Sequence, residues 1–227
     1  MTAPEAVIFD LDGVLVDSEQ VWDEVRERLA DERGGRWHPR AQRDMMGMSS
    51  IEWSRYMSDE LGVPLSPQEV SAEVVRRVEE RYRRELPLLP GAVDAVRRLA
   101  ARWPLGLASS SNRPIIDLVL ELAGIAELFP VTVSSEEVDK GKPAPDVYLE
   151  AASRLGVEPG RTAAIEDSTN GLLAARAAGL GVIAIPNHAF PPDAEALEVA
   201  DVTLDSLDAL SPDAIDDAVS RRATEDE

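Results

Sequence analysis

Two aspartates near the start of the chain, Asp10 and Asp12, follow a short apolar run, Ala6 to Phe9. The run predicts a buried strand, and Gly13 predicts that the chain turns away directly after Asp12. Buried carboxylates need a partner charge or hydrogen bonds, and a divalent cation, which prefers oxygen ligands, would supply that partner. One aspartate would then attack as a nucleophile while the other transfers protons. The alternative is an ordinary Asp-Gly turn at a solvated strand end.

A second polar stretch, Ser109 to Asn112, lies between a predicted strand, residues 105–109, and a predicted helix, residues 114–123. Hydroxyl groups and the free amides of a helix N-terminus together bind phosphate oxygens well. The stretch therefore indicates a phosphate site, with a serine-rich helix cap as the alternative.

Lys140 and Lys142 are the only lysines of the chain. Lys142 precedes Pro143, which biases the lysine backbone towards an extended conformation. An ammonium group at this place would balance the charge of both a carboxylate nucleophile and a phosphoryl group. Alternatively, both lysines are solvated side chains of a loop.

A second pair of acids, Glu166 and Asp167, ends another apolar strand, predicted over residues 162–166. Neighbouring residues of a regular strand face opposite ways, but at the exit of a strand both can face one site. With Asp10 and Asp12 they form an oxygen-rich set that suits Mg²⁺. The alternative is that these acids cap the following helix.

All four motifs lie after predicted strands, and the strands alternate with helices. We predict strands over residues 6–9, 105–109, 131–133, 162–166, 182–185 and 202–204, and helices over residues 91–102, 114–123, 146–155 and 171–178. This alternation predicts an α/β fold with a parallel sheet and helices on both faces. Ligands of such sheets bind at the carboxyl ends of the strands, where the motifs would meet.

The stretch after the first strand has a different pattern. We predict only helices here, over residues 17–33, 40–46, 51–61 and 67–84, with a cap on the first from Asp17 or Ser18. The prediction is therefore an all-helical cap domain, residues 17–86, inserted into an α/β core domain, residues 1–16 and 87–227. A helical insert beside the active end of the first strand would act as a lid.

The chain has 227 residues and a formal net charge of −20. This acidity argues against nucleic acid or an anionic membrane as a partner, so a phosphate needs a local cluster of cations and amides. The chain has no cysteine, which excludes disulfides and thiol catalysis. We see neither a membrane-spanning apolar run nor a secretory signal, so we expect a cytoplasmic protein. A lid that must open favours a monomer.

In this order the four motifs resemble those of the haloacid dehalogenase-like (HAD) hydrolase superfamily, over nearly the whole chain. The matching residues are Asp10-Leu11-Asp12-Gly13, Ser109, Lys142-Pro143 and Glu166-Asp167. The resemblance implies a Rossmann-like parallel sheet with a helical cap. It also implies that Asp10 forms an aspartyl-phosphate and that Asp12 is the general acid and base.

The resemblance further implies how the phosphoryl group and the metal are held. Ser109, Ser110, Asn112 and Lys142 would bind the phosphoryl oxygens. Mg²⁺ would bind to the Asp10 carboxylate, the Asp12 carbonyl, Asp167 and Glu166. The acid at position 12 also argues against dehalogenation, since related dehalogenases lack it.

Within the superfamily the chain is similar to the group that contains β-phosphoglucomutase and sugar-phosphate phosphatases. The similar segments are Asp17-Ser18-Glu19, Gly47-Met48-Ser49, Leu89-Pro90-Gly91 and Lys142-Pro143-Ala144-Pro145. The implied reaction is hydrolysis of a small phosphomonoester, with a sugar or polyol phosphate as the expected substrate class.

Three departures separate the chain from β-phosphoglucomutase. Trp22 and Ser50 stand where the mutase has a cap histidine and a cap arginine, and Asn112-Arg113 replaces a Lys-Asn pair. A mutase must hold two phosphates, and the missing cation leaves the second unpaired. We therefore expect a phosphatase. The alternatives are a phosphohexomutase, in which another arginine (Arg43, Arg55 or Arg113) substitutes, and a non-catalytic phosphometabolite-binding protein.

Overall fold

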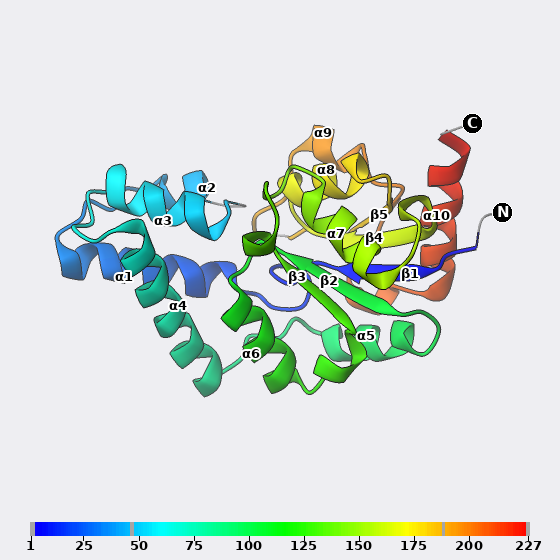
Figure 1. Ribbon diagram of the computed structural model, residues 1–227, viewed down its shortest axis with the longest axis horizontal. Helices are drawn as coiled ribbons and strands as arrows, with labels where there is room; N and C mark the ends of the chain where they lie inside the picture. The colour runs from blue at the N-terminus through cyan, green and yellow to red at the C-terminus, as the bar shows by residue number, and fades with distance from the viewer. Residues whose placement is uncertain (1–2, 46–47, 188, 226–227) are drawn as a thin grey trace.

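The centre of the molecule is a six-stranded parallel sheet with the strand order β3-β2-β1-β4-β5-β6 (Figure 1). The structure, a computed structural model, describes residues 3–45, 48–187 and 189–225. The strands are β1 (Ala6–Phe9), β2 (Leu105–Ser109), β3 (Val131–Ser134), β4 (Thr162–Glu166), β5 (Gly181–Ala184) and β6 (Val202–Thr203). The predicted α/β Rossmann-like fold is confirmed.

The sheet is covered on both faces, as its apolar central strands require. Successive residues of β1 point to opposite faces: Val7 and Phe9 belong to one buried apolar cluster and Ile8 to the other. Helices α5 (Ala92–Ala100), α6 (Arg113–Ala123) and α10 (Pro212–Glu225) contribute to the first cluster. The second cluster includes α7 (Asp146–Leu155), α8 (Thr169–Ala177) and α9 (Ala194–Leu197). Short 3₁₀ turns span Ala126–Leu128, Ser135–Glu137, Pro159–Arg161 and Leu207–Ala209.

The strand order brings the predicted motifs to one edge of the sheet. Phe9 of β1 pairs with Leu107 of β2 and with Ile165 of β4, so the carboxyl ends of the three strands lie level. The chain continues to one side of β1 with β2 and β3 and to the other side with β4 to β6. Such a reversal of strand order is where open α/β sheets bind their ligands.

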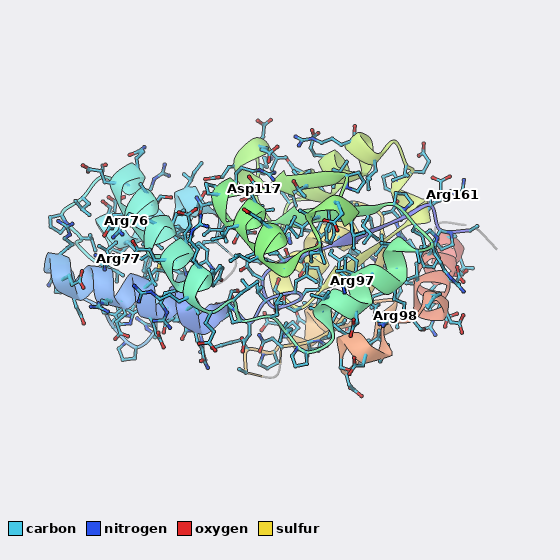
Figure 2. All side chains as sticks on the ribbon, turned by 90° about the horizontal axis from the view of Figure 1, so that it is seen from below. Arg76, Arg77, Arg97, Arg98, Asp117 and Arg161 are labelled. Carbon is cyan, nitrogen blue, oxygen red and sulfur yellow. The ribbon has the colours of Figure 1, made fainter. Side chains whose placement is uncertain are left out.

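Four helices lie between β1 and α5 in the sequence and form the helical insert, beyond one end of the sheet (Figure 1). They are α1 (Glu19–Arg33), α2 (Ala41–Met45), α3 (Ser50–Asp59) and α4 (Pro67–Arg84). Capping boxes begin α3 at Ser49 and α4 at Ser66, which explains where both helices start. Arg77 of α4, labelled in Figure 2, donates to Glu32 of α1 at 2.7 Å and holds the two helices together.

The insert differs from the prediction at its first helix. Ser18 precedes α1, but its backbone is already helical (φ −90°, ψ −26°), so its side chain makes no capping hydrogen bond. The predicted turn at residues 47–49 lies partly outside the described residues. No strand occurs within the described residues from Glu19 to Arg84, as predicted.

The two connections between the insert and the sheet run side by side. Asp17 donates its amide to the carbonyl of Pro87 at 2.8 Å, and Leu89 donates to Leu15 at 3.0 Å. The predicted domain boundaries, at residues 16/17 and 86/87, fall within this pairing, and the division into core and cap stays a prediction. Within the described ranges, no helix has the length and apolar character to cross a membrane.

Candidate active site

A buried lysine joins the ends of three strands. Lys142, from the loop between β3 and α7, donates from its Nζ to Asp10 Oδ1 at 2.8 Å and to Glu166 Oε1 at 2.6 Å. A third hydrogen bond, of 3.0 Å, goes to the carbonyl of Ala108 in β2. The structure thus brings Asp10, Lys142 and Glu166 together, whereas Lys140, the other lysine, is exposed.

Glu166 is the anchor of this arrangement. Its Oε1 accepts from Lys142 and from the Tyr148 hydroxyl, each at 2.6 Å. Its Oε2 accepts from the amides of Asp167 and Ser168 and from the Ser168 hydroxyl. Both oxygens are therefore engaged by protein donors, and Glu166 fixes the position of the Lys142 ammonium group.

The electrostatics of the cluster show an excess of negative charge. Burial, with repulsion from Glu166 and Asp12, raises the pKa of Asp10 to about 8, although Lys142 opposes the shift. Burial and the neighbouring Glu166 and Asp10 likewise raise the pKa of Asp167 well above its usual range. Burial alone would lower the pKa of Lys142, but attraction to Asp10 and Glu166 outweighs it and the net shift is upward. One ammonium group does not balance these carboxylates.

A divalent cation would supply the missing positive charge. Asp10, Glu166 and Asp167 are buried, and each offers a carboxylate oxygen within 4.8 Å of the others. The Asp167 carboxylate accepts no hydrogen bond from the described residues, so its oxygens are available. Carboxylate oxygens are the ligands that Mg²⁺ prefers, and the residues present fit this ion.

Gly13 allows Asp167 to reach the site. Its backbone is left-handed (φ +77°), and a Cβ atom added there would lie 1.9 Å from Asp167 Oδ2. Any side chain at position 13 therefore meets two penalties, backbone strain and a collision with the carboxylate.

We expect Gly13→Ala to lose both stability and Mg²⁺ binding. Backbone strain alone costs about 1–3 kcal/mol, and displacement of Asp167 adds the loss of a ligand. The matched control is Gly34→Ala: Gly34 has φ +79° but nothing within 4 Å of the added Cβ. Thermal unfolding and calorimetric Mg²⁺ titration of both variants separate the two effects. Equal Mg²⁺ affinity in the two variants would show that the approach of Asp167 to Gly13 does not matter.

Asp12 has surroundings quite unlike those of Asp10. Its Oδ2 accepts from the Ser111 hydroxyl at 2.6 Å and from Ser109 at 3.5 Å, while its buried Oδ1 has no partner among the described residues. The Ser109 hydroxyl in turn accepts from the Ser111 amide at 3.0 Å. Ser111 was not among the predicted site residues. Its position in a run of three serines gave no sign of which hydroxyl reaches Asp12.

The predicted phosphate-binding residues differ in whether they reach the cavity between the sheet and the insert. Ser110 and Lys142 border the cavity described below, whereas Ser109 is completely buried and does not border it. The amide group of Asn112 donates to Glu136 Oε1 at 2.7 Å, and Asn112 does not border the cavity. The roles of these residues in phosphate binding stay predictions.

The alternative explanations as helix caps find no support in the hydrogen bonds. Asn112 begins α6 without a side-chain capping bond. The cap of α8 is Ser168, which accepts from the Gly171 amide at 3.1 Å. Glu166 and Asp167 therefore do not cap that helix.

A cavity of about 680 Å³ joins the sheet edge to the insert. The sheet side contributes Asp10, Asp12, Ser110, Lys142 and Asp167, and the insert contributes Glu19, Trp22, Arg26, Arg43 and Trp53, among other residues. The volume suits a small organic ligand. The Asp10 carboxylate, the Asp12 carboxylate, whose Oδ1 has no partner among the described residues, and the Lys142 ammonium group all border this one cavity.

Several sequence candidates lie elsewhere. Of the three arginines considered as substitutes for the missing cap cation, only Arg43 borders the cavity, and Arg113 is held by Asp117, Glu137 and Thr132. The Nε2 atom of His38 lies 3.1 Å from the Tyr56 hydroxyl, and His38 does not border the cavity. His188 lies outside the described residues.

Comparison with known proteins gives the family. A family model described as haloacid dehalogenase-like hydrolase matches residues 4–179. Hexitol phosphatase B of Escherichia coli (strain K12) is 33% identical over 225 residues, which cover 91% of this chain and 94% of that protein. The bifunctional riboflavin kinase/FMN phosphatase of Arabidopsis thaliana is 33% identical over 203 residues. That match covers 88% of this chain and 53% of the Arabidopsis protein, so the chain spans about half of its length.

Two solved structures share the architecture. CbbY from Rhodobacter sphaeroides, in complex with phosphate, gives a TM-score of 0.84 at 27% identity and covers 94% of this chain and 99% of its own. β-Phosphoglucomutase from Clostridium difficile gives a TM-score of 0.83 at 23% identity and covers 97% of this chain and 99% of its own. At this identity the likeness is one of fold. Both curated relatives carry a phosphatase name, in agreement with the predicted class of enzyme, a phosphoric monoester hydrolase. The matched family model covers most of the chain, and the chain belongs to the haloacid dehalogenase-like hydrolases.

Proposed function

We propose that this protein is a Mg²⁺-dependent phosphatase that hydrolyses a small phosphomonoester, of the sugar or polyol phosphate class, through an aspartyl-phosphate at Asp10. The observation that carries the proposal is the hydrogen bond of 2.8 Å between Lys142 and Asp10 Oδ1. It fixes one oxygen of the carboxylate. The other accepts no hydrogen bond from the described residues and lies near the Asp12 carboxylate, at a cavity of metabolite size. The name of hexitol phosphatase B supports the substrate class.

The chain's own groups supply the parts that phosphoryl transfer requires, namely positioning and charge neutralisation. The free oxygen of Asp10 attacks phosphorus as the bond from phosphorus to the leaving oxygen breaks, and Asp12 gives that oxygen a proton. Asp12 then takes a proton from water, whose oxygen attacks the phosphorus of the aspartyl-phosphate. The bond between phosphorus and the Asp10 oxygen breaks, inorganic phosphate leaves with the oxygen that came from water, and the Asp10 carboxylate is restored.

The remaining residues stabilise charge. Lys142 would neutralise charge on the phosphoryl oxygens, and Ser110 would donate hydrogen bonds to them. Ser109 and Asn112, which do not border the cavity, stay predicted phosphate ligands. Asp10, the Asp12 carbonyl and Asp167 would hold Mg²⁺, with Glu166 as a further candidate ligand, and the bound ion would supply positive charge to the same oxygens. Glu166 already accepts five hydrogen bonds, which favours a role in holding Lys142 over direct ligation.

The test is release of inorganic phosphate from a panel of phosphorylated sugars, polyols and nucleotides, with Mg²⁺ and with a chelator. We expect Mg²⁺-dependent release from at least one sugar or polyol phosphate. The variant Asp167→Asn should lose this Mg²⁺-dependent activity. Binding of substrate without release would indicate a phosphometabolite-binding protein.

The panel also tests the mutase alternative, which Arg43 at the cavity keeps open. It includes β-glucose 1-phosphate, with and without a glucose bisphosphate. Conversion to glucose 6-phosphate, with little release of phosphate, would overturn the proposal of a phosphatase. We further propose a monomer acting in the cytoplasm, which size-exclusion chromatography with light scattering and cell fractionation would check.

A further inference from the structure

A buried cation that forms no ion pair with any described residue lies in the part of the cavity that the insert forms. Arg26 of α1 is 9% exposed, and its guanidinium carbon lies 4.9 Å from the ring centroid of Trp22 and 4.7 Å from that of Trp53. Among the described residues the guanidinium group donates no hydrogen bond and forms no ion pair, and its Nε is buried without a partner. Arg77, also on the insert, pairs with both Glu32 and Glu73.

The two indole rings hold the Arg26 side chain in place without accepting hydrogen bonds from it. Cation–π contacts with aromatic faces attract the guanidinium group, but they take up none of its N–H donors. Burial lowers the pKa of Arg26 to about 10, against the attraction of Glu19, Asp12 and Asp23, so the group stays cationic at neutral pH. A buried charge normally has a hydrogen-bonded partner.

The position of Arg26 identifies the missing partner as a ligand. Arg26 borders the same cavity as Asp10 and Lys142, and so does Arg43, which forms no ion pair with any described residue. The phosphoryl group of a substrate must lie at Asp10, on the sheet side. Arg26 comes from the insert, and the group that it meets is on the leaving part of the substrate.

We propose that Arg26 binds an anionic group, a carboxylate or a second phosphate, on the leaving group of the substrate. The inference rests on the proposed phosphatase function and narrows its substrate class to phosphorylated sugar acids or sugar bisphosphates. The planar guanidinium fork matches both anions with paired hydrogen bonds. Because Trp22 and Trp53 already fix its plane, little side-chain freedom is lost when the anion binds.

The experiment compares substrates that differ only in the second anion. The pairs are glucitol 6-phosphate with gluconate 6-phosphate, for a carboxylate, and fructose 6-phosphate with fructose 1,6-bisphosphate, for a phosphate. We expect wild-type kcat/KM to be at least tenfold higher for the anionic member of one pair, and the pair concerned identifies the anion. Arg26→Gln should lower that value about 100-fold, mainly through KM, and change the neutral member less than threefold. Arg26→Lys, which keeps the charge but not the fork, should recover part of the loss.

The matched control is Arg81→Gln, which removes a half-exposed cation of α4 that pairs with Glu24 and does not border the cavity. It should leave both substrate pairs unchanged. Arg26→Met should raise the melting temperature of the ligand-free protein, since it removes a buried charge without a partner. A purely structural Arg26 predicts the opposite: a lower melting temperature and an equal loss of activity on both members of each pair.

Failure of this inference is separable from failure of the proposed function. If no substrate releases phosphate, the phosphatase proposal fails, and calorimetric binding of gluconate 6-phosphate and glucitol 6-phosphate to the wild type and Arg26→Gln still tests Arg26. Equal affinity of the wild type for these two compounds, and for the two members of the fructose pair, would overturn the role of Arg26.

Discussion

Replacing Asp10 by asparagine is expected to lower phosphate release at least about 10⁴-fold, because loss of a nucleophile removes the covalent step itself. Asparagine has the shape of aspartate, and its side-chain oxygen can still accept from Lys142, which keeps Glu166 and the Ala108 carbonyl as partners. The fold should therefore survive while the chemistry stops. The measurement is kcat for phosphate release from the best substrate of the panel.

The same variant has a predicted signature in stability. Burial raises the pKa of Asp10 from 3.8 to about 8, so the folded protein binds this proton more tightly than the unfolded chain does. Stability should then fall as pH rises between about 4 and 8. Without divalent cations, Asp10→Asn should flatten that fall in melting temperature, and at pH 8 it should be at least as stable as the wild type.

The control for Asp10→Asn is Asp193→Asn, because Asp193 is an exposed carboxylate that borders the same cavity without belonging to the buried cluster. It should change kcat no more than a few fold. Retention of wild-type turnover by Asp10→Asn would remove the aspartyl-phosphate from the mechanism.

The sheet and the edge that carries the site could be predicted because local patterns specify them. Strand β4 and helices α4 and α7 begin and end at the predicted residues, and Ser66 with Pro67 marks the start of α4 through a capping box. Strands β3, β5 and β6 differ from the prediction by one residue at one or both ends. Exits from strands are poorly specified where apolar residues continue into the loop, as Ile185 does after β5.

The partners of individual side chains could not be predicted, because they come from distant segments. Arg26 follows Trp22 by one helical turn, a visible neighbour pair, but Trp53 reaches it from α3. Tyr148 lies on the buried face of α7, where apolar periodicity explains it as core. Its bond to Glu166 depends on how α7 packs against the sheet.

Asn112 is a further residue whose partner could not be predicted from the sequence. Its place after β2 predicts a phosphate ligand, a role that stays a prediction. In the structure its amide group donates to Glu136, from the segment after β3. The same Glu136 carboxylate accepts from Ser50 of the insert at 3.0 Å. Ser50, one of the positions that depart from β-phosphoglucomutase, thus connects the insert to the segment after β3, a contact that sequence spacing does not reveal.

Replacing Asp12 by asparagine is expected to lower kcat about 10²–10⁴-fold with a smaller change in KM, because proton transfer acts in the transition state. An asparagine oxygen can still accept from Ser111, so the loop geometry should hold while the proton is lost. Ser111→Ala is the matched variant: it keeps the carboxylate but removes its bond of 2.6 Å, and it should cost about tenfold or less.

The choice of leaving group separates the acid role of Asp12 from its base role. p-Nitrophenolate leaves without protonation, so Asp12→Asn should still transfer phosphate from p-nitrophenyl phosphate to Asp10. Water has no base to activate it afterwards, and the aspartyl-phosphate should accumulate. Stopped-flow absorbance should therefore show a rapid burst of about one p-nitrophenolate per enzyme, followed by slow turnover, as covalent catalysis requires. If Asp12→Asn instead slows both phases equally, Asp12 positions the substrate and does not transfer the proton, and the assignment of the two aspartates to nucleophile and acid fails.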